Sequence, residues 1–202
     1  MLLPRIQTNF ISKFLALFLA LVLAHAVLGY DFPLSPESIR EAYAIGQRHD
    51  GDFLARYKRS IPSLKEKGGG CISAVRVETP FLQVVSFAEN APNYSMQDAA
   101  KRFYDKPLPF RIYLDICYMP SAPPPGSLQI NIFQNKKAIV PVSDNRSPYI
   151  PVVDVGWTLP PNGEQVQLEF LPDKISSSTL TIQIDTPDDQ HAELELDLTS
   201  LR

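Results

Sequence analysis

The segment QVQLEFLPDKISSSTLTIQIDTPDDQHAELELDL, residues 165–198, contains three runs in which apolar and polar side chains alternate. The runs are 165–170, 179–185 and 192–198. Successive side chains of a strand point to opposite faces, so each run predicts a strand with one apolar face and one polar face. Antiparallel strands covered on one side have this pattern, whereas buried parallel strands are apolar throughout. The three runs predict a meander, and we expect the rest of the chain to continue its sheet.

Upstream runs of the same kind extend the β region. Strands are predicted at 110–118, at 128–132, at 138–142 and around 153–157, with Pro, Gly and Asn residues marking turns between them. About eight or nine strands between turn signals is the number expected for a sandwich. We therefore expect a mainly β fold, an immunoglobulin-like antiparallel β-sandwich with an N-terminal helical arm. A small barrel is the structural alternative.

Two segments precede these runs. Segment 71–88 is rich in β-branched and aromatic residues, and Pro80 divides it, which predicts two strands or one strand bent at an edge. Segment 95–104 predicts a helix, because Ser95 and Asp98 have the spacing of a capping box.

The domain boundaries follow from the N-terminal pattern. Ser35-Pro36-Glu37 predicts a helix start, since Ser caps free amides, Pro suits the first position and Glu meets the positive helix end. A second short helix is predicted at 53–57, and the glycines of 68–70 predict a flexible joint. Residues 30–70 are thus expected to be a helical arm with a joint, and 71–202 a β-sandwich domain. The arm is expected to dock through Ile39, Tyr43, Phe53 and Tyr57.

Residues 1–29 predict a signal peptide. Arg5 and Lys13 precede the apolar run 14–23, and Ala24-His25-Ala26 places small residues at a cleavage site. An uncleaved anchor is the alternative, because the uncharged run extends to Tyr30. In both cases the body is exported, to the periplasm, the envelope or outside the cell, and cleavage would leave no membrane span.

Composition and charge limit the partners. With 45% apolar and 20% charged residues, the chain can bury a core. Without Arg5 and Lys13, 17 basic residues face 22 acidic ones, which argues against nucleic acid as a partner. Segment 56–67 is basic and segment 159–202 is acidic. Each is either a solvated face, or they meet each other or a partner.

Four short segments carry a resemblance. SPESIREAY (35–43), GQR (46–48) and FLARY (53–57) resemble the N-terminal signature of an exported family of uncharacterised bacterial proteins. VETPFLQVV (77–85) is similar to the x-T-P-[FY]-x-Q-V-V stretch of that family. The resemblance implies a secreted or envelope location, and it implies neither an activity nor catalytic residues.

Histidine and serine patterns point to no site. His49 and His191 lie beside acidic turn residues without the spacing of metal ligands, so we expect surface histidines and no metal or cofactor. The chain also lacks a Gly-x-Ser-x-Gly elbow.

Paired carboxylates are the main catalytic candidates. The pairs are Asp50/Asp52, Asp188/Asp189 and Glu193/Glu195. Two facing carboxyl groups could hydrolyse a glycosidic bond. Turn chemistry explains the first two pairs, and a solvated strand face explains the third.

Cys71 and Cys117 are candidates for a disulfide, since the chain has two cysteines and is predicted to be exported. The bridge would stabilise by roughly 4 kcal/mol in the chain-entropy model. Two unpaired thiols are the alternative.

Tyr118, Tyr149 and Trp157 are candidates for lining a ligand groove, with core packing as the ordinary explanation for Trp157.

These observations favour an exported, non-catalytic β-sandwich that binds a protein or polymer partner. A carboxylate-dependent hydrolase acting on an extracellular polymer is the alternative. Binding through loops is consistent with the way sandwiches carry function.

Overall fold

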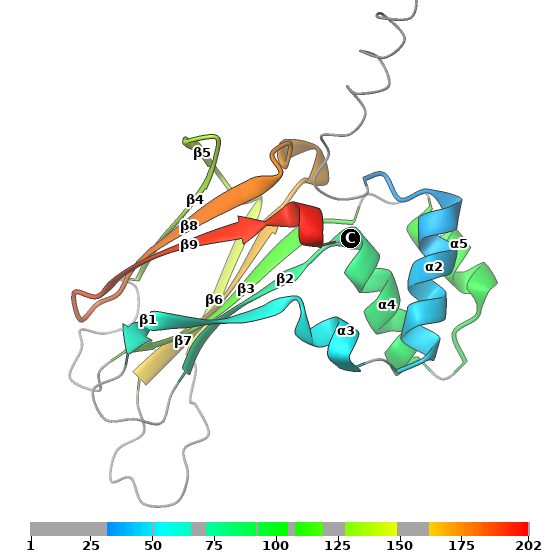
Figure 1. Cartoon of the computed structure of the whole chain (residues 1–202), viewed down its shortest axis with the longest axis horizontal. Coiled ribbons are helices and arrows are strands. Elements are labelled where there is room, and N and C mark those ends of the chain that lie inside the picture. The colour runs from blue at the N-terminus through cyan, green and yellow to red at the C-terminus, as the bar shows by residue number, and fades with distance from the viewer. Residues whose placement is uncertain are drawn as a thin grey trace, which may run out of the picture.

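The computed structural model describes residues 32–49, 51–65, 72–91, 93–104, 108–118, 128–148 and 162–201. In these ranges two antiparallel sheets pack over one core, and helices lie at one end of them (Figure 1). The expected mainly β fold with two antiparallel sheets is confirmed.

The larger sheet, sheet A, has the strand order β1-β2-β3-β7-β6. Its strands are β1 (Lys58–Lys65), β2 (Ile72–Glu78), β3 (Phe110–Tyr118), β7 (Asn162–Phe170) and β6 (Ser143–Pro148). β3 pairs with β7 along its whole length and with β2 on its other side. β2, β3 and β7 are therefore interior strands, with β1 and β6 at the edges.

Sheet B has the order β5-β4-β8-β9. Its strands are β5 (Lys137–Ile139), β4 (Gln129–Gln134), β8 (Thr179–Asp185) and β9 (His191–Asp197). The predicted meander is wrong, because β7 belongs to sheet A while β8 and β9 belong to sheet B. The alternation shows which face of a strand is buried, but both sheets turn the same kind of face to a shared core. It therefore does not reveal which neighbour a strand pairs with.

The core consists of the apolar side chains on the two inner faces. Ile182 of β8 and Leu114 of β3 are 0% exposed. Removing these side chains from water is the main favourable term in folding. Other buried members are Val77, Ile112, Ile116, Val166, Leu168, Phe170, Leu180, Ile184, Ala192 and Leu196.

The helices begin with capping side chains. In α2 (Pro36–Gln47), Ser35 Oγ accepts a hydrogen bond of 3.0 Å from the Ser38 amide, as the sequence predicts. In α5 (Met96–Phe103), the Ser95 amide donates to Asp98 Oδ2 at 3.1 Å, and Ser95 Oγ accepts from the Asp98 amide at 3.2 Å. The predicted capping box is confirmed. The short helix α3 (Gly51–Ala55) precedes β1.

The prediction that segment 71–88 forms only strand is wrong after residue 78. A helix, α4 (Pro80–Asn90), follows β2 directly. Thr79 Oγ1 accepts from the Leu82 amide at 3.2 Å, and Pro80 occupies the first helical turn. Most of α4 is buried, so tertiary packing decides its state and overrides the strand preference of its valines.

Two edge strands lie where the sequence predicts none. β1 falls in the expected arm and pairs with β2, with an irregular register around Pro62. β6 is polar up to its final residue, Pro148, and pairs with β7. The strand predicted at 138–142 is confined to β5. The strand predicted around 153–157, the glycine joint and residues 1–29 lie outside the described residues.

α2 packs closely against α4. A Cβ added to Gly46 would lie 2.3 Å from the carbonyl oxygen of Val85. Of the expected docking residues, Ile39 and Tyr57 are buried, and Tyr43 and Phe53 pack partly buried against the core.

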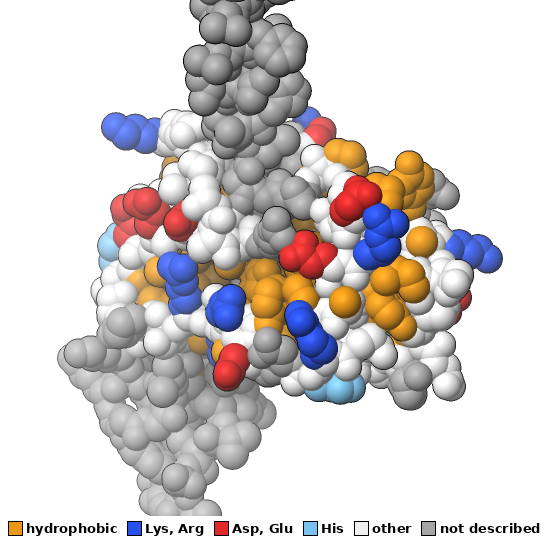
Figure 2. Space-filling view, turned by 45° about the vertical axis from the view of Figure 1, so that its right-hand side comes forward, with side chains coloured by type: hydrophobic (Ala, Val, Ile, Leu, Met, Phe, Trp, Pro, Cys, Tyr) orange, Lys and Arg blue, Asp and Glu red, His pale blue; other side chains and the backbone are white. Residues whose placement is uncertain are grey.

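Figure 2 shows apolar side chains next to Lys and Arg side chains on one side of the molecule. In the described ranges, none of the helices is both long and apolar enough to span a bilayer.

Candidate ligand-binding face

The outer face of sheet A carries polar side chains that the strand registers align in rows. In one row Arg76, Tyr113, Gln167 and Asn145 lie opposite one another across β2, β3, β7 and β6. Residues opposite one another in adjacent strands have Cβ atoms about 5 Å apart, so their side chains interact. We call these four residues the polar row. Flanking rows contain Glu78, Arg111 and Glu169 on one side and Asp115, Gln165 and Ser147 on the other.

In the first flanking row one guanidinium, that of Arg111, is shared by two carboxylates. Arg111 Nε donates to Glu169 Oε1 at 2.7 Å, and Arg111 Nη1 donates to Glu78 Oε2 at 3.2 Å. All three side chains are partly buried. Such charge-assisted bonds fix the row in place and occupy the two carboxylates.

Arg76 lies over the ring of Tyr113 in the polar row. Its guanidinium carbon lies 4.2 Å from the centroid of the Tyr113 ring, a cation–π contact. The Tyr113 hydroxyl donates to Glu78 Oε2 at 3.1 Å. Burial raises the pKa of Tyr113, and the charge of Glu78 raises it further, so the hydroxyl stays protonated. Among the described residues Arg76 forms no ion pair, and its N–H groups are available to a ligand.

The amide side chains of the face are oriented by their neighbours. Gln167 Nε2 donates to Glu169 Oε1 at 3.0 Å, and Gln165 Nε2 donates to Asp115 Oδ1 at 2.8 Å. Because the NH₂ groups point at carboxylates, the amide carbonyl oxygens remain as acceptors.

A hollow of about 190 Å³ lies over this face. Polar side chains dominate its lining, so it is suited to a polar ligand held by hydrogen bonds. The lining residues are Arg76, Tyr113, Asn145, Arg146, Ser147, Gln165 and Gln167.

An ionic cluster lies beside the hollow at the β6 edge. Arg146 forms two bonds of 2.9 Å with Asp144 and lies 3.6 Å from Glu164 Oε1. Its Nη1 also donates to the Leu128 carbonyl at 2.7 Å, next to β4 of the other sheet. Arg146 therefore ties the two sheets together at this edge. The Glu164 side chain is 3% exposed, and burial raises its pKa, which Arg146 partly offsets.

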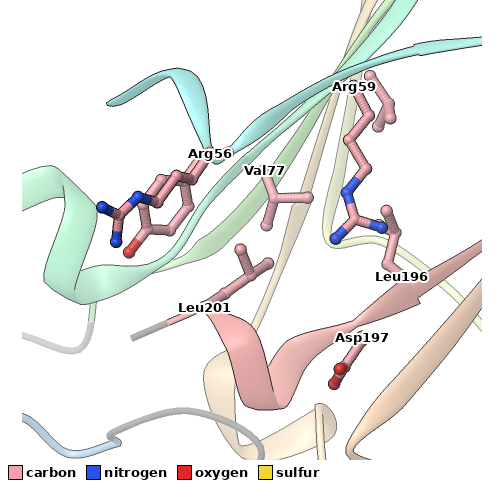
Figure 3. A pocket seen from close by; sticks show the side chains of 8 residues that line it. Arg56, Arg59, Val77, Leu196, Asp197 and Leu201 are labelled. Atoms are coloured by element: carbon pink, nitrogen blue, oxygen red, sulfur yellow. The ribbon is translucent and has the colours of Figure 1, made fainter. Parts of the chain in front are cut away.

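The basic and acidic segments of the sequence meet between β1 and β9. Arg56, Arg59 and Asp197 line a common pocket there (Figure 3). Hydrogen bonds from Thr199 lower the pKa of Asp197, with a smaller contribution from Arg59. The pocket volume is about 10 Å³, room for about one water molecule, so this contact joins the sheet edges and leaves no space for a ligand.

A broader and more open depression lies on the helices. Tyr94, Asp98, Lys101 and Arg102 line its volume of about 450 Å³. The Arg102 guanidinium carbon lies 4.0 Å from the centroid of the Phe87 ring. This contact resembles that of Arg76 with Tyr113 but lies at the other end of the molecule, on α5.

Few of the side chains that the sequence predicts for a site lie among the described residues. Tyr118 ends β3, but its side chain is not among the described ones, and Tyr149 and Trp157 lie outside the described residues. Cys117 is buried and disulfide-bonded. Cys71 lies outside the described residues, so the predicted pairing stays a prediction.

The predicted carboxylate pairs do not converge on the hollow. Asp50 lies outside the described residues, and Asp52 is exposed on α3. Asp188 and Asp189 lie in the turn between β8 and β9. Glu193 and Glu195 are exposed on β9, where Glu193 accepts from Gln183 at 3.0 Å.

His49 and His191 are both exposed. His191 Nδ1 lies 2.7 Å from Asp185 Oδ1, and His49 follows the end of α2 with a φ of 52°. In the described ranges no three His, Cys, Asp or Glu side chains come together as a metal site would require.

No family model matches the chain, and no curated protein matches it.

Sequence reasoning did not identify the polar row. Polar residues alternate in 111–115 and 165–169, which marks two solvated strand faces. Arg76 and Asn145 lie in the same row as these residues only because β2 pairs with β3 and β6 pairs with β7. The local pattern contains no signal for those pairings.

Proposed function

We propose that this protein is an exported, non-catalytic β-sandwich module that binds a polymer partner, protein or glycan, through the outer face of sheet A. The observation that carries the proposal is the polar row. There the Arg76 guanidinium, which has no ion-pair partner among the described residues, is held over Tyr113 beside oriented amides. Groups fixed before a ligand arrives lose little conformational freedom on binding, which favours recognition.

Export is supported by the apolar leader and by the resemblance to an exported bacterial family. We propose that the mature chain acts in the periplasm, in the envelope or outside the cell.

The proposal includes a finer fold assignment, an immunoglobulin-like sandwich with an N-terminal helical arm formed by α2 and α3. The order β2-β3-β7-β6 facing β5-β4-β8-β9 corresponds to the immunoglobulin order A-B-E-D facing C′-C-F-G. The chain also visits the sheets in the immunoglobulin sequence, two strands at a time. On this assignment α4 and α5 are an insertion between strands A and B.

A carboxylate-dependent hydrolase remains the alternative. It would need two carboxyl groups facing each other across a substrate. Glu193 and Glu195 are exposed on a flat strand face, and Glu164 is buried beside Arg146. These positions support binding over hydrolysis.

The test is cross-linking and co-purification of the full-length tagged chain from its native envelope. The face variant carries Gln165→Lys and Gln167→Lys, and the matched control carries Thr181→Lys and Gln183→Lys on the outer face of sheet B. We expect a stoichiometric partner that is lost with the face variant and kept with the control. Equal retention by both variants, or recovery of the wild-type chain alone, would contradict the proposal. Thermal unfolding of each variant checks that it folds.

A further inference from the structure

We propose that the hollow on sheet A binds a neutral, polyhydroxylated chain, a glycan, with Arg76 as the residue that determines specificity. This inference rests on the proposed function and names its ligand class.

The hollow lies over the outer face of the sheet and extends from β2 across β3 and β7 to the edge strand β6. β3 and β7 are paired on both sides, so their backbone groups are used within the sheet. A peptide that binds as an added strand needs unpaired backbone at an edge. Over β3 and β7 a ligand in the hollow is therefore recognised by side chains, and at the β6 edge Pro148 and the inward-pointing charges of β6 discourage strand addition.

Those side chains match hydroxyl groups. Arg76 offers N–H donors, while Gln165 and Gln167 offer carbonyl oxygens because their NH₂ groups already donate to Asp115 and Glu169. A hydroxyl group donates one hydrogen bond and accepts others, so it can satisfy both kinds of partner at once. A chain with several hydroxyl groups per unit would use the guanidinium and both amides together.

The surrounding charges favour a neutral ligand. On the outer face Glu78 and Glu169 share Arg111, whereas Arg146, which lines the hollow from the β6 edge, is paired with Asp144. Asp115 accepts from Gln165 but has no cation beside it among the described residues. An anionic ligand at Arg76 would thus approach carboxylates on the same face, at an energetic cost that a neutral ligand avoids.

The lining also disfavours a protein partner at this position. Cores of protein interfaces are rich in apolar and aromatic side chains. Among the described residues of the lining, Tyr113 is the one aromatic side chain, and the Arg76 guanidinium lies over its ring.

The test is affinity electrophoresis and calorimetry of the full-length chain with soluble neutral polysaccharides, namely dextran, galactomannan, xyloglucan and laminarin. Polygalacturonate serves as an anionic comparison. We expect binding of at least one neutral polymer, with little change between low and high salt. Arg76→Gln should weaken that binding by about tenfold or more, since bonds to charged groups contribute strongly.

The matched control is Arg102→Gln, which removes another guanidinium that lies over an aromatic ring, at a site away from the hollow. It should bind like the wild type. Gln165→Ala gives a second, uncharged test of the hollow and should also weaken binding.

The remaining outcomes overturn the inference in distinguishable ways. Glycan binding that is unchanged in both Arg76→Gln and Gln165→Ala would show that the glycan binds elsewhere than on the outer face of sheet A. Preference for polygalacturonate would contradict the inference that the ligand is a neutral glycan. Failure to bind any polysaccharide, with a protein partner still captured through this face, would overturn the glycan inference and leave the proposed function standing. If neither a polysaccharide nor a partner engages the face, both fail.

Discussion

Glu164 places a carboxyl group on the inner side of sheet A, where its side chain is 3% exposed. Its Oε1 atom faces Arg146 at 3.6 Å, and in the described part of the chain its Oε2 atom has no hydrogen-bond partner. Arg146 is shared, since it also forms two bonds with Asp144. The ionised form of Glu164 is therefore incompletely compensated.

Burial raises the pKa of Glu164 in the folded chain above its unfolded value. The folded state then binds more protons than the unfolded state between these two pKa values, so the contribution of Glu164 to stability falls as pH rises through that window. We predict that the unfolding free energy of the wild type minus that of Glu164→Gln decreases from pH 4 towards neutral pH. Urea denaturation of both proteins across this range measures it. A difference that is constant with pH would contradict the prediction.

Gly46 marks the closest approach of α2 to α4. An added Cβ would lie 2.3 Å from the Val85 carbonyl oxygen and 2.7 Å from the Ala88 Cβ. We predict that Gly46→Ala lowers the unfolding free energy by about 1 to 3 kcal/mol, because backbone must move, although alanine is the better helix former. Thermal or urea unfolding measures it.

Ala44 supplies the reference for this prediction, since it is exposed on the same helix. Ala44→Gly should cost about 1 kcal/mol, the intrinsic difference between the two residues in a helix. If Gly46→Ala stabilised the protein by that amount, the result would contradict the close contact of α2 with α4 at Gly46.

At the residue scale, the sequence predicts contacts between near neighbours and misses those between strands. Ser95 and Asp98 are three positions apart, so their reciprocal bonds follow from spacing alone. The contact of Arg76 with Tyr113 depends on the register of β2 against β3, with α4 and α5 between them in the chain. A register cannot be read from either strand separately.

The first turn of α4 is capped by the side chain of Thr79. Thr79 is 0% exposed, and its Oγ1 accepts from the Leu82 amide at the beginning of the helix. We predict that Thr79→Ala lowers the unfolding free energy by about 0.5 to 2 kcal/mol and that Thr79→Ser restores much of the loss. Urea denaturation of the three proteins is the measurement. Equal stability of Thr79→Ala and wild type would contradict a capping role.

At the element scale, strands that turn an apolar face to the core were predictable, and polar strands were not. β8 alternates buried and half-buried positions, and its predicted bounds agree with the structure. β6 reads Ser-Asp-Asn-Arg-Ser-Pro and is a strand because β7 offers it a hydrogen-bonding edge. The inward-pointing charges and the proline of β6 are features that discourage further strand addition at a sheet edge.

For the whole molecule, Cys117 connects the fold to the predicted export. It is buried and disulfide-bonded, and its amide donates to Ser73 Oγ at 3.0 Å. We predict that peptide mapping without reductant recovers Cys71 linked to Cys117. Reduction should lower the unfolding free energy by at most roughly 4 kcal/mol. Recovery of Cys71 as a free thiol in the exported chain would contradict the pairing.

The central claim, that the outer face of sheet A meets the partner, is tested most directly by site-specific photo-cross-linking in the native envelope. A diazirine side chain replaces Gln167 on sheet A or, in the matched protein, Gln183 on sheet B. Both positions are glutamines in the middle of a strand, and both are half-buried. We predict a defined adduct from position 167 and none from position 183. An adduct from position 183 alone, or the same adduct from both positions, would contradict the claim.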